Sequence, residues 1–387
     1  MFKAYTPTRI LFGAGQLNNL HKQTMPGKKA MIVISNGKSG RNLLPRLEEQ
    51  LSLCGTDAVV FDKVEANPLK STVEAGAAFA RENGCDFVIA LGGGSVMDAS
   101  KIMAMLAPNP GDLWDYVLAG SGKGQPVKNA ALPMIAITTT AGTGSEVDAF
   151  GVVTNAEANE KIGIGGRDDM FPVLAIVDPE LMTTVPPKFT AYQGWDALAH
   201  SLEGYVSSGG TMMSDMFALT AIENIANYLP VAVKNGDNIE AREKVAFANT
   251  LSGLVMVVGA LTSQHSLEHA MSAYHQDLPH GAGLAMLSKA YFTHFINAHG
   301  CDNRFVKMAQ VMGCPDAKEP MDFIAALDKL QKGCGIADLK MSDYGIKPDE
   351  FPTLVKNAKA TMGKMFRFDR VPLTDADCLA IYTAAYK

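Results

Sequence analysis

The sequence predicts a doubly wound, Rossmann-like α/β domain followed by an all-helical domain. In the first half of the chain, short β-branched runs alternate with helical stretches, which is typical of a parallel sheet covered by helices on both faces. In the second half, apolar residues recur at three- and four-residue intervals, and strand-like alternation nearly vanishes. A chain of 387 residues is also too long for one ordinary core. We place the boundary near Val185, with the first domain over residues 1–185 and the second over residues 186–387.

Four buried strands are expected in the first domain, at residues 28–35, 57–64, 86–95 and 132–140. Helical patterns separate them, at residues 43–53, at residues 71–83, and after the third strand through residue 103. Parallel strands connected in this way bring their carboxyl ends to one edge of the sheet, where open α/β sheets bind their ligands. The loops that follow these strands are therefore the first places to look for a site.

The second domain is expected to be built from helices alone. Pro186 and Pro187 discourage regular structure at the boundary. Beyond them, helical patterns cover residues 215–229 and 239–261, and several shorter ones continue to the last residue. The longest apolar run, residues 251–261, is too short to cross a bilayer and is typical of a buried helix.

Composition and charge exclude several classes of function. A net charge of -6 and a pI near 5.8 leave no basic face for nucleic acid or for an anionic membrane. The N-terminal segment has no apolar signal core, and the six cysteines form no C-x-x-C pair. This pattern suits free thiols in a reducing compartment, so we expect a cytoplasmic protein that binds neither nucleic acid nor membrane.

Histidines gather in one short segment of the helical half, which contains His265, His269 and His280. Elsewhere, His200 follows Asp196 by four residues. Residues four apart on a helix share a face, so Asp196 with His200 and His265 with His269 form two pairs of donors. His280 lies between a proline and a glycine, which can turn its side chain inward. One such pair alone is usually a solvated helix face, but the whole set suggests one carboxylate and three imidazoles around a divalent metal.

Two glycine-rich loops follow predicted strands of the first domain. The segment LGGGSVMDASK at residues 91–101 opens a helix, and TTTAGTGSEVDAF at residues 138–150 follows the next strand. Glycines let a phosphate approach the backbone, and a helix N-terminus offers oriented N–H groups, although a structural tight turn could use the same glycines. Two loops of this kind favour an extended, phosphate-bearing cofactor. We expect the site in the cleft between the domains, where ligand pockets are common.

With these motifs in place, the chain resembles the iron-containing (group III) alcohol dehydrogenases over essentially its full length. The matching motifs are GGGSxxDxxK at residues 92–101, TTAGTGSE at 139–146, GxDALxHxxE at 194–203 and HxxxH…PHG at 265–281. Any one of them is weak evidence, whereas together they are highly specific. The resemblance implies a nucleotide-binding α/β domain, a helical metal-binding domain, and a homodimer or larger homo-oligomer.

The resemblance also implies roles for particular residues. The family's metal ligands match Asp196, His200, His265 and His280. His269 matches a histidine near the nicotinamide that could relay a proton. Gly93, Gly94 and Ser95 match pyrophosphate contacts, and Asp98 stands in the same motif. The residues that match other cofactor contacts are Asn67, Thr139, Thr140, Thr143, Ser145 and Lys161.

The chain departs from the family pattern at the end of its first predicted strand, at Ser35 and Asn36, where NAD-preferring relatives carry an acid. An acid there would bind the ribose hydroxyls and repel a 2′-phosphate. Here Ser35, Asn36 and Ser39 can donate hydrogen bonds, and Lys38 or Arg41 can offset the phosphate's charge. We therefore expect NADP(H) to be favoured over NAD(H). Further on, residues 369–372 replace the family's C-terminal Asn-Pro-Arg signal.

Together these features predict a metal-dependent alcohol dehydrogenase or aldehyde reductase that moves a hydride between a small alcohol or aldehyde and NAD(P)(H). A nitrogen- and oxygen-rich site suits Fe²⁺ or Zn²⁺, and the Irving–Williams trend favours zinc, whereas the resemblance favours iron. The metal would act as a Lewis acid on the substrate oxygen. The alternatives are a zinc glycerol dehydrogenase-like polyol oxidation, a dehydroquinate synthase-like lyase, and a non-enzymatic metal store.

Overall fold

The computed structural model describes all 387 residues, which form two compact units. The α/β unit contains residues 6–140 and 145–184. The helical unit contains residues 185–387, together with the first five residues and the short segment 141–144. The chain therefore enters the helical unit briefly, in the middle of the second glycine loop, before it returns to the sheet.

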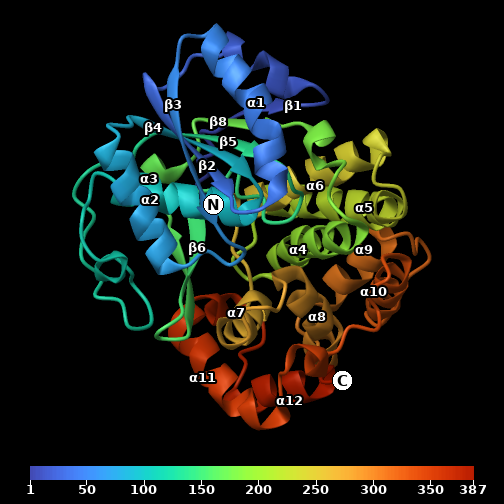
Figure 1. Ribbon diagram of the computed structural model, residues 1–387. Coiled ribbons are helices and arrows are strands. Elements are labelled where there is room, and N and C mark those ends of the chain that lie inside the picture. The colour runs from blue at the N-terminus through green and yellow to red at the C-terminus, as the bar shows by residue number, and fades with distance from the viewer. The chain divides into compact units, whose positions relative to one another are not determined.

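A six-stranded parallel sheet forms the centre of the α/β unit, in the order β1-β8-β5-β4-β2-β3 (Figure 1). Its strands are β1 Arg9–Phe12, β2 Lys29–Ser35, β3 Asp57–Val64, β4 Phe87–Gly92, β5 Met134–Thr138 and β8 Leu174–Val177. The four predicted strands are present, but β4 and β5 end earlier than predicted because glycines and threonines begin the loops there. Strands β1 and β8, which are only four residues long, are not among the predicted strands.

Three helices cover the two faces of this sheet, namely α1 Lys38–Leu53, α2 Lys70–Glu82 and α3 Gly94–Leu106. Alternate residues of each strand point to opposite faces. Ile32 and Ile89 pack with Leu47 and Leu51 of α1 in one buried cluster. Their neighbours on the strands, such as Met31 and Val88, join side chains of α2 and α3 in a separate cluster on the other face. Both faces are therefore buried, as a parallel sheet requires.

A two-stranded antiparallel hairpin, also absent from the predictions, completes the α/β unit. It consists of β6 Phe150–Asn155 and β7 Glu160–Gly165. Glu160 anchors it, because its buried carboxylate accepts hydrogen bonds from Trp114 Nε1 and from the backbone N–H and hydroxyl of Ser121, each at 2.7 Å. The hairpin follows the second glycine loop directly, so it limits where that loop can run.

The second unit is helical, apart from connecting turns and loops. Its α-helices are α4 Pro187–Val206, α5 Met212–Lys234, α6 Ile239–Val258, α7 Gln264–Tyr274, α8 His280–Asn297, α9 Asp302–Val311, α10 Asp322–Gly333, α11 Phe351–Met362 and α12 Asp375–Ala385. The expectation that Pro186 and Pro187 discourage regular structure is wrong, because Pro186 caps α4 and Pro187 is its first residue. A proline at that position loses no intrahelical hydrogen bond. The predicted helix over residues 239–261 ends at Val258, before Gly259.

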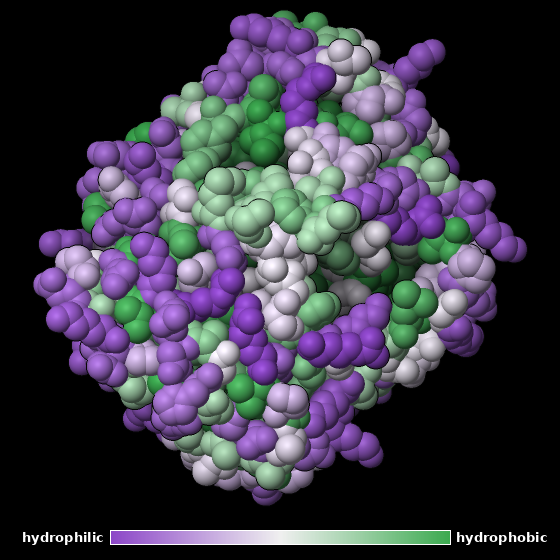
Figure 2. Space-filling view, turned by 180° about the vertical axis from the view of Figure 1, so that it is seen from behind, coloured by the Kyte–Doolittle hydropathy of each residue, from purple (hydrophilic) through white to green (hydrophobic).

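The centre of this unit is α4, which packs against α5, α6 and α8, while α7 packs against α8 and α11 (Figure 1). By length and composition α5 is a helix that could cross a membrane, although core helices pass the same test and α5 packs on α4 and α6. On the face drawn in Figure 2, hydrophilic residues predominate and surround patches of hydrophobic ones. Large apolar side chains exposed at the surface include Leu118, Met212 and Met216.

Candidate metal centre and cofactor loops

Helix α4 carries three titratable side chains along one buried face, at Asp196, His200 and Glu203. Their spacing of four and three residues places them in a row on the helix. Close packing holds the helix in place, because a Cβ on Gly194 would lie only 2.2 Å from the Leu229 side chain of α5. The polar row is therefore fixed inside the helical unit.

The Pro-His-Gly sequence is the start of α8. Pro279 is extended and caps the helix, so His280 is its first residue. A Cβ on Gly281 would lie 1.9 Å from the carbonyl oxygen of Tyr192 on α4, which leaves room for no side chain. The first turn of α8 therefore lies directly on the backbone of α4, and this contact brings His280 to Asp196.

Helix α7 supplies the remaining histidines, His265 and His269, both buried, with Glu268 between them. The helix is fixed to the end of the chain, because the hydroxyl of Tyr382 donates a 2.7 Å hydrogen bond to the carbonyl of Leu267. Three helices that are separated in the sequence thus meet at one cluster of donors.

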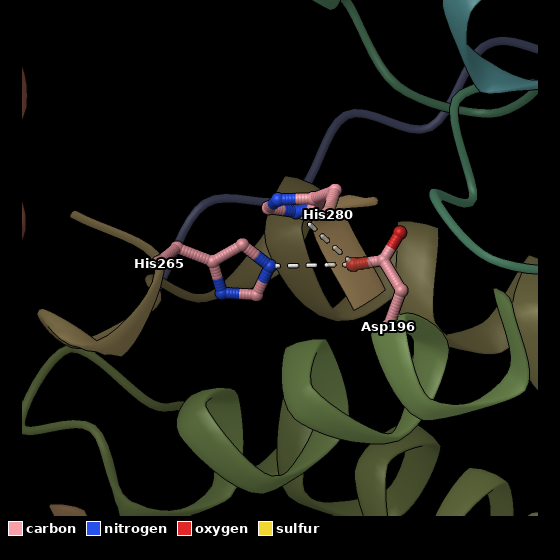
Figure 3. Close-up of side chains that lie close together, drawn as sticks. All are labelled: Asp196, His265 and His280. Atoms are coloured by element: carbon pink, nitrogen blue, oxygen red, sulfur yellow. Dashed lines mark hydrogen bonds and ion pairs between the residues drawn. The ribbon is translucent and has the colours of Figure 1, made fainter. Parts of the chain in front are cut away.

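One oxygen of Asp196 is the focus of the cluster. The Nε2 atoms of His265 and His280 each lie 3.4 Å from Asp196 Oδ1, and both rings point toward it (Figure 3). The ligand atoms of these three residues all lie within 4.8 Å of one another. His200 is adjacent, with its Nδ1 3.6 Å from the same oxygen and its ring stacked on that of His265, with centroids 4.3 Å apart. The structure therefore brings all four predicted ligands together.

Burial and neighbouring charges shift the protonation of this cluster. Burial and the nearby His265 lower the pKa of His200 to about 3, which keeps that ring neutral. Burial also opposes ionisation of Asp196, but His200, His280 and His265 hold its pKa well below the usual value. For His265, burial is outweighed by the carboxylates of Glu203 and Asp196, which raise its pKa to about 10. The carboxylate at the centre is thus ionised and surrounded by imidazoles.

His269 lies next to the other histidines. Its ring centroid is 5.1 Å from that of His280 and 6.3 Å from that of His265. Its ligand atom also lies within 4.8 Å of those of Glu268 and His280, so a second group of donors overlaps the first. The proton relay through His269 stays a prediction, and the ring lies close enough to His280 to be consistent with it.

Sequence reasoning missed two carboxylates at this centre. The carboxylate of Glu203 hydrogen-bonds to Nδ1 of His265, and that of Glu268 hydrogen-bonds to Nδ1 of His280. Both glutamate side chains are fully buried. A signal was present, because Glu203 follows His200 by three residues and Glu268 follows His265 by three, which places each on a ligand-bearing helix face.

The donor set fits a divalent metal ion. Asp196 offers an oxygen, and the three histidines offer imidazole nitrogens, which suit iron and zinc alike. The buried Nδ1 of His200 also makes no hydrogen bond, an unusual state for an imidazole inside a protein. A metal bound among these residues would satisfy such an atom and reduce the negative charge of the buried carboxylates.

In the α/β unit, the two glycine loops lie side by side at the carboxyl ends of β4 and β5. Gly93 caps α3, Gly94 begins it, and Ser95 follows. A Cβ on Gly93 would lie 2.8 Å from the side chain of Thr140, and Thr139 N–H donates to the Gly92 carbonyl at 3.0 Å. These glycines therefore let the loops touch, and α3 directs its first N–H groups to the same edge, as an anion site requires.

Two of the predicted cofactor residues, Asp98 and Ser145, are held in a buried network. Ser145 Oγ donates to Asp98 Oδ1 at 2.6 Å, and the backbone N–H of Val152 donates to Oδ2 at 2.9 Å. Lys101 Nζ donates to Ser145 Oγ, to Asp148 Oδ1 at 2.6 Å and to the Phe150 carbonyl. Burial raises the pKa of Asp98 to about 6 despite the nearby lysine. The Asp and Lys of GGGSxxDxxK thus tie α3 to the second loop.

The remaining predicted cofactor residues fall into two groups. Lys161 on β7 donates to the side chain of Asn67 at 3.1 Å, and Asn67 has a positive φ of 54°. Thr143 belongs to the short segment that enters the helical unit, where the next residue, Gly144, donates to Asn249 at 2.9 Å. The contact brings Asn67 and Lys161 together, and their role in binding a cofactor stays a prediction.

The loop after β2 is open to solvent. Ser35 ends the strand, and Asn36, Lys38 and Ser39 are exposed. Lys38 begins α1, so these side chains surround a helix N-terminus. Arg41, one turn further on, forms an exposed ion pair with Asp62 at 2.7 Å. Arg41 is therefore less available to a ligand phosphate than its position in the sequence predicts.

Comparison with known proteins identifies the family. The model of the family "Iron-containing alcohol dehydrogenase" matches residues 7–179, and that of "Fe-containing alcohol dehydrogenase family, C-terminal" matches residues 190–386. The NAD-dependent methanol dehydrogenase of Bacillus methanolicus is 31% identical over 370 residues, covering 92% of this chain and 93% of that protein. The 1,3-propanediol dehydrogenase of Klebsiella pneumoniae is 33% identical over 371 residues, covering 92% of both chains.

Solved structures agree with these matches. An archaeal halo-thermophilic alcohol dehydrogenase from a Red Sea brine pool superposes with a TM-score of 0.92 and 31% identity, over 100% of this chain and 99% of that one. A 1,3-propanediol oxidoreductase superposes with a TM-score of 0.89 and 30% identity, over 100% of both chains. The chain belongs to the iron-containing alcohol dehydrogenase family, and its fold, its motifs and the histidine cluster on α4, α7 and α8 agree with this assignment.

Proposed function

We propose that the protein is a metal-dependent alcohol dehydrogenase or aldehyde reductase that transfers a hydride between a small alcohol or aldehyde and a nicotinamide cofactor. The observation that carries this proposal is the meeting of Asp196, His265 and His280 within 4.8 Å of one another. The full-length match to a dehydrogenase family supports the reaction type. This family match does not favour glycerol dehydrogenase-like or dehydroquinate synthase-like chemistry.

The metal ligands we propose are Asp196, His200, His265 and His280, with iron as the working metal and zinc as the alternative. The metal would supply Lewis acidity toward the substrate oxygen. Around it, the imidazoles and the carboxylate hold their geometry because three packed helices fix them. We propose that His269 accepts or returns the hydroxyl proton, because its ring lies 5.1 Å from that of His280.

The cofactor would bind at the carboxyl ends of the strands. In this proposal, Gly93, Gly94 and Ser95 bind the pyrophosphate at the start of α3. The other contacts come from Asn67, Thr139, Thr140, Thr143 and Lys161, while Asp98 and Ser145 contribute through the network that supports the second loop. When bound, the nicotinamide would supply the hydride chemistry, and these residues would hold and orient the cofactor.

We also propose that the enzyme prefers NADP(H), works in the cytoplasm and forms homo-oligomers. The loop of residues 35–41 contains no acid, and Lys38 is exposed beside it. Several relatives, among them those of Bacillus methanolicus and Bacillus subtilis, are named for NAD or NADH. The preference therefore rests on Lys38 and on the missing acid.

A substrate panel tests the proposal most directly. Purified protein reconstituted with ferrous or zinc salt would be assayed with straight-chain alcohols, diols and the matching aldehydes, using both NAD(H) and NADP(H). We expect metal-dependent turnover in at least one direction and a higher kcat/KM with NADP(H). The Ser35→Asp variant should then shift the ratio toward NAD(H). A wild-type enzyme faster with NAD(H), and unaffected by this change, would contradict the cofactor preference while leaving the reaction type intact.

A further inference from the structure

Two buried glutamates contact the predicted metal ligands on the side away from Asp196. We infer that Glu203 and Glu268 are positioning residues, which fix the orientation and tautomer of His265 and His280 so that each presents Nε2 to the metal. The inference rests on the proposed metal site and assigns a role to two residues that are not among the ligands. Three steps support it.

The first step is the hydrogen-bonding capacity of the groups. An ionised carboxylate can only accept, so Nδ1 of His265 must donate to Glu203, and Nδ1 of His280 must donate to Glu268. A metal-bound imidazole is neutral and carries one ring hydrogen, which these contacts place on Nδ1. In that tautomer the lone pair that can bind a metal lies on Nε2, the atom that in both histidines is 3.4 Å from Asp196 Oδ1.

The second step is burial. Both glutamate side chains have no exposed surface, and an ionised carboxylate in that position is costly unless it is well paired. Glu203 also accepts a 3.2 Å hydrogen bond from the hydroxyl of Thr262, which precedes α7. The second carboxylate oxygen is thereby held as well, and the carboxylate can turn only by breaking this bond.

The third step is the space made for Glu268. A Cβ on Gly283 would lie 2.8 Å from Cγ of Glu268, so a larger residue on α8 would displace this side chain. The two glutamate–histidine pairs link α4 to α7 and α7 to α8. Glu203 on α4 supports the histidine of α7, and Glu268 on α7 supports the histidine of α8. Partners of this kind raise the basicity of metal-bound histidines and fix their orientation.

The test measures metal binding and requires no turnover. Apo-protein of the wild type, Glu203→Gln, Glu203→Met, Glu268→Gln and Glu268→Met would be titrated with Co²⁺ and Zn²⁺ in competition with a chelator. The glutamine variants keep a neutral acceptor, so we expect the affinity to fall about 10-fold, and about 100-fold for the methionine variants, which keep none. The Co²⁺ absorption spectrum should also change, because the rings are free to turn.

Glu160→Gln is the matched control, since Glu160 is also a buried, hydrogen-bonded glutamate but supports the hairpin in the α/β unit. It should lower the melting temperature and leave metal affinity unchanged. Wild-type protein that binds neither ion would refute the metal site itself. Wild-type protein that binds metal, with glutamate variants that bind it within about 2-fold of the wild-type affinity, would refute only the positioning role.

A measurement on the wild type covers the case in which a variant does not fold. In ¹⁵N-histidine spectra of the Zn²⁺-loaded protein, assigned with single histidine variants, His265 and His280 should carry their hydrogen on Nδ1 and bind metal through Nε2. A hydrogen on Nε2 of either residue would overturn the inference for that residue.

Discussion

At the scale of single residues, the centre is defined by one carboxylate oxygen and the nitrogens around it. Asp196 Oδ1 lies 3.4 Å from two imidazole nitrogens and 3.6 Å from a third. These distances are longer than good hydrogen bonds, which prefer about 2.9 Å. Three imidazole nitrogens thus converge on one carboxylate oxygen at distances longer than the ideal hydrogen bond, as donors around a metal would.

Replacing one proposed ligand tests this arrangement. We expect the metal affinity of His280→Ala to fall roughly 100-fold, so that the variant loses at least about 90% of its metal. Its activity should be lost with the metal. His269→Ala should keep its metal and lose part of its rate, because its proposed role is proton transfer. Metal content by mass spectrometry, measured beside kcat, separates the two cases. Metal retained in His280→Ala would remove that residue from the ligand set.

A second residue-scale prediction concerns Asp369 on the C-terminal side of α11. Its Oδ1 accepts hydrogen bonds from Ser263 N–H and the Tyr291 hydroxyl, both at 3.0 Å, while its buried Oδ2 has no partner. Burial, helped by the charge of Glu203, raises the pKa of Asp369 to about 7. Because the folded pKa exceeds the unfolded value of 3.8, the folded state is relatively destabilised as the pH rises through this window.

Asp369→Asn should therefore stabilise the protein at alkaline pH. The amide keeps the accepting oxygen and removes the buried charge, so we expect a gain of about 2–4 kcal/mol at pH 8 that vanishes near pH 4. Urea unfolding at both pH values, with the metal state held constant, measures this difference. An equal effect at pH 4 and pH 8 would mean that Asp369 does not titrate in this range.

At the scale of elements, close backbone contacts determine where the ligands lie. Gly281 allows α8 to lie on α4, since a Cβ would be 1.9 Å from the Tyr192 carbonyl. Glycine positions of this kind can be recognised in a sequence only as part of a motif, because the contact is between segments far apart in the chain. The histidine pairs were visible from their spacing of four residues, whereas the approach of the helices was not.

The same limit explains what sequence reasoning missed. Strands β1 and β8 are too short to show a clear pattern, yet both belong to the parallel sheet. Glu203 ends the GxDALxHxxE motif and Glu268 lies inside HxxxH, but their partners lie on other helices and could not be assigned by local spacing. What could be predicted was local periodicity and motif identity, and what could not was the pairing of buried polar groups.

Gly281→Ala gives an element-scale prediction. The added methyl group must push α8 away from α4, so we expect a loss of about 2–4 kcal/mol of stability, in the range of overpacked cores, and weaker metal binding. Gly163→Ala is a suitable control, because a Cβ there meets no atom within 4 Å. Thermal unfolding and Co²⁺ titration of both variants check this. Equal behaviour of the two variants would show that the contact is unimportant.

The network around Lys101 gives another prediction at this scale. Its ammonium group is fully buried between Asp148 and Ser145, with Asp98 beyond the serine. Lys101→Met would leave buried carboxylates without their counter-charge, which typically costs 3–5 kcal/mol. We also expect weaker cofactor binding, because the second glycine loop loses its support. Calorimetric unfolding and NADPH fluorescence titration measure the two effects, and unchanged values for both would exclude this role.

At the scale of the whole molecule, the two units hold different parts of the proposed chemistry. The histidine cluster belongs to the helical unit, and the loop that caps α3 belongs to the α/β unit. We expect His280→Ala to keep NADPH affinity within about 3-fold. Gly93→Val should keep its metal while NADPH affinity falls at least about 10-fold, because the two substitutions remove contacts that share no partner. Mass spectrometry and fluorescence titration check these outcomes. Loss of both ligands in either variant would contradict this independence.

The spacing of the proposed ligands along the chain has a consequence for how the helical unit resists heat and proteases. Asp196 and His265 are 69 residues apart. An ion bound to both would act as a reversible cross-link that closes this loop in the unfolded chain, which in the loop-entropy picture corresponds to about 4 kcal/mol. Chelation would then open the segment between α4 and α7 to cleavage. The availability of metal would set the lifetime of the protein as well as its activity.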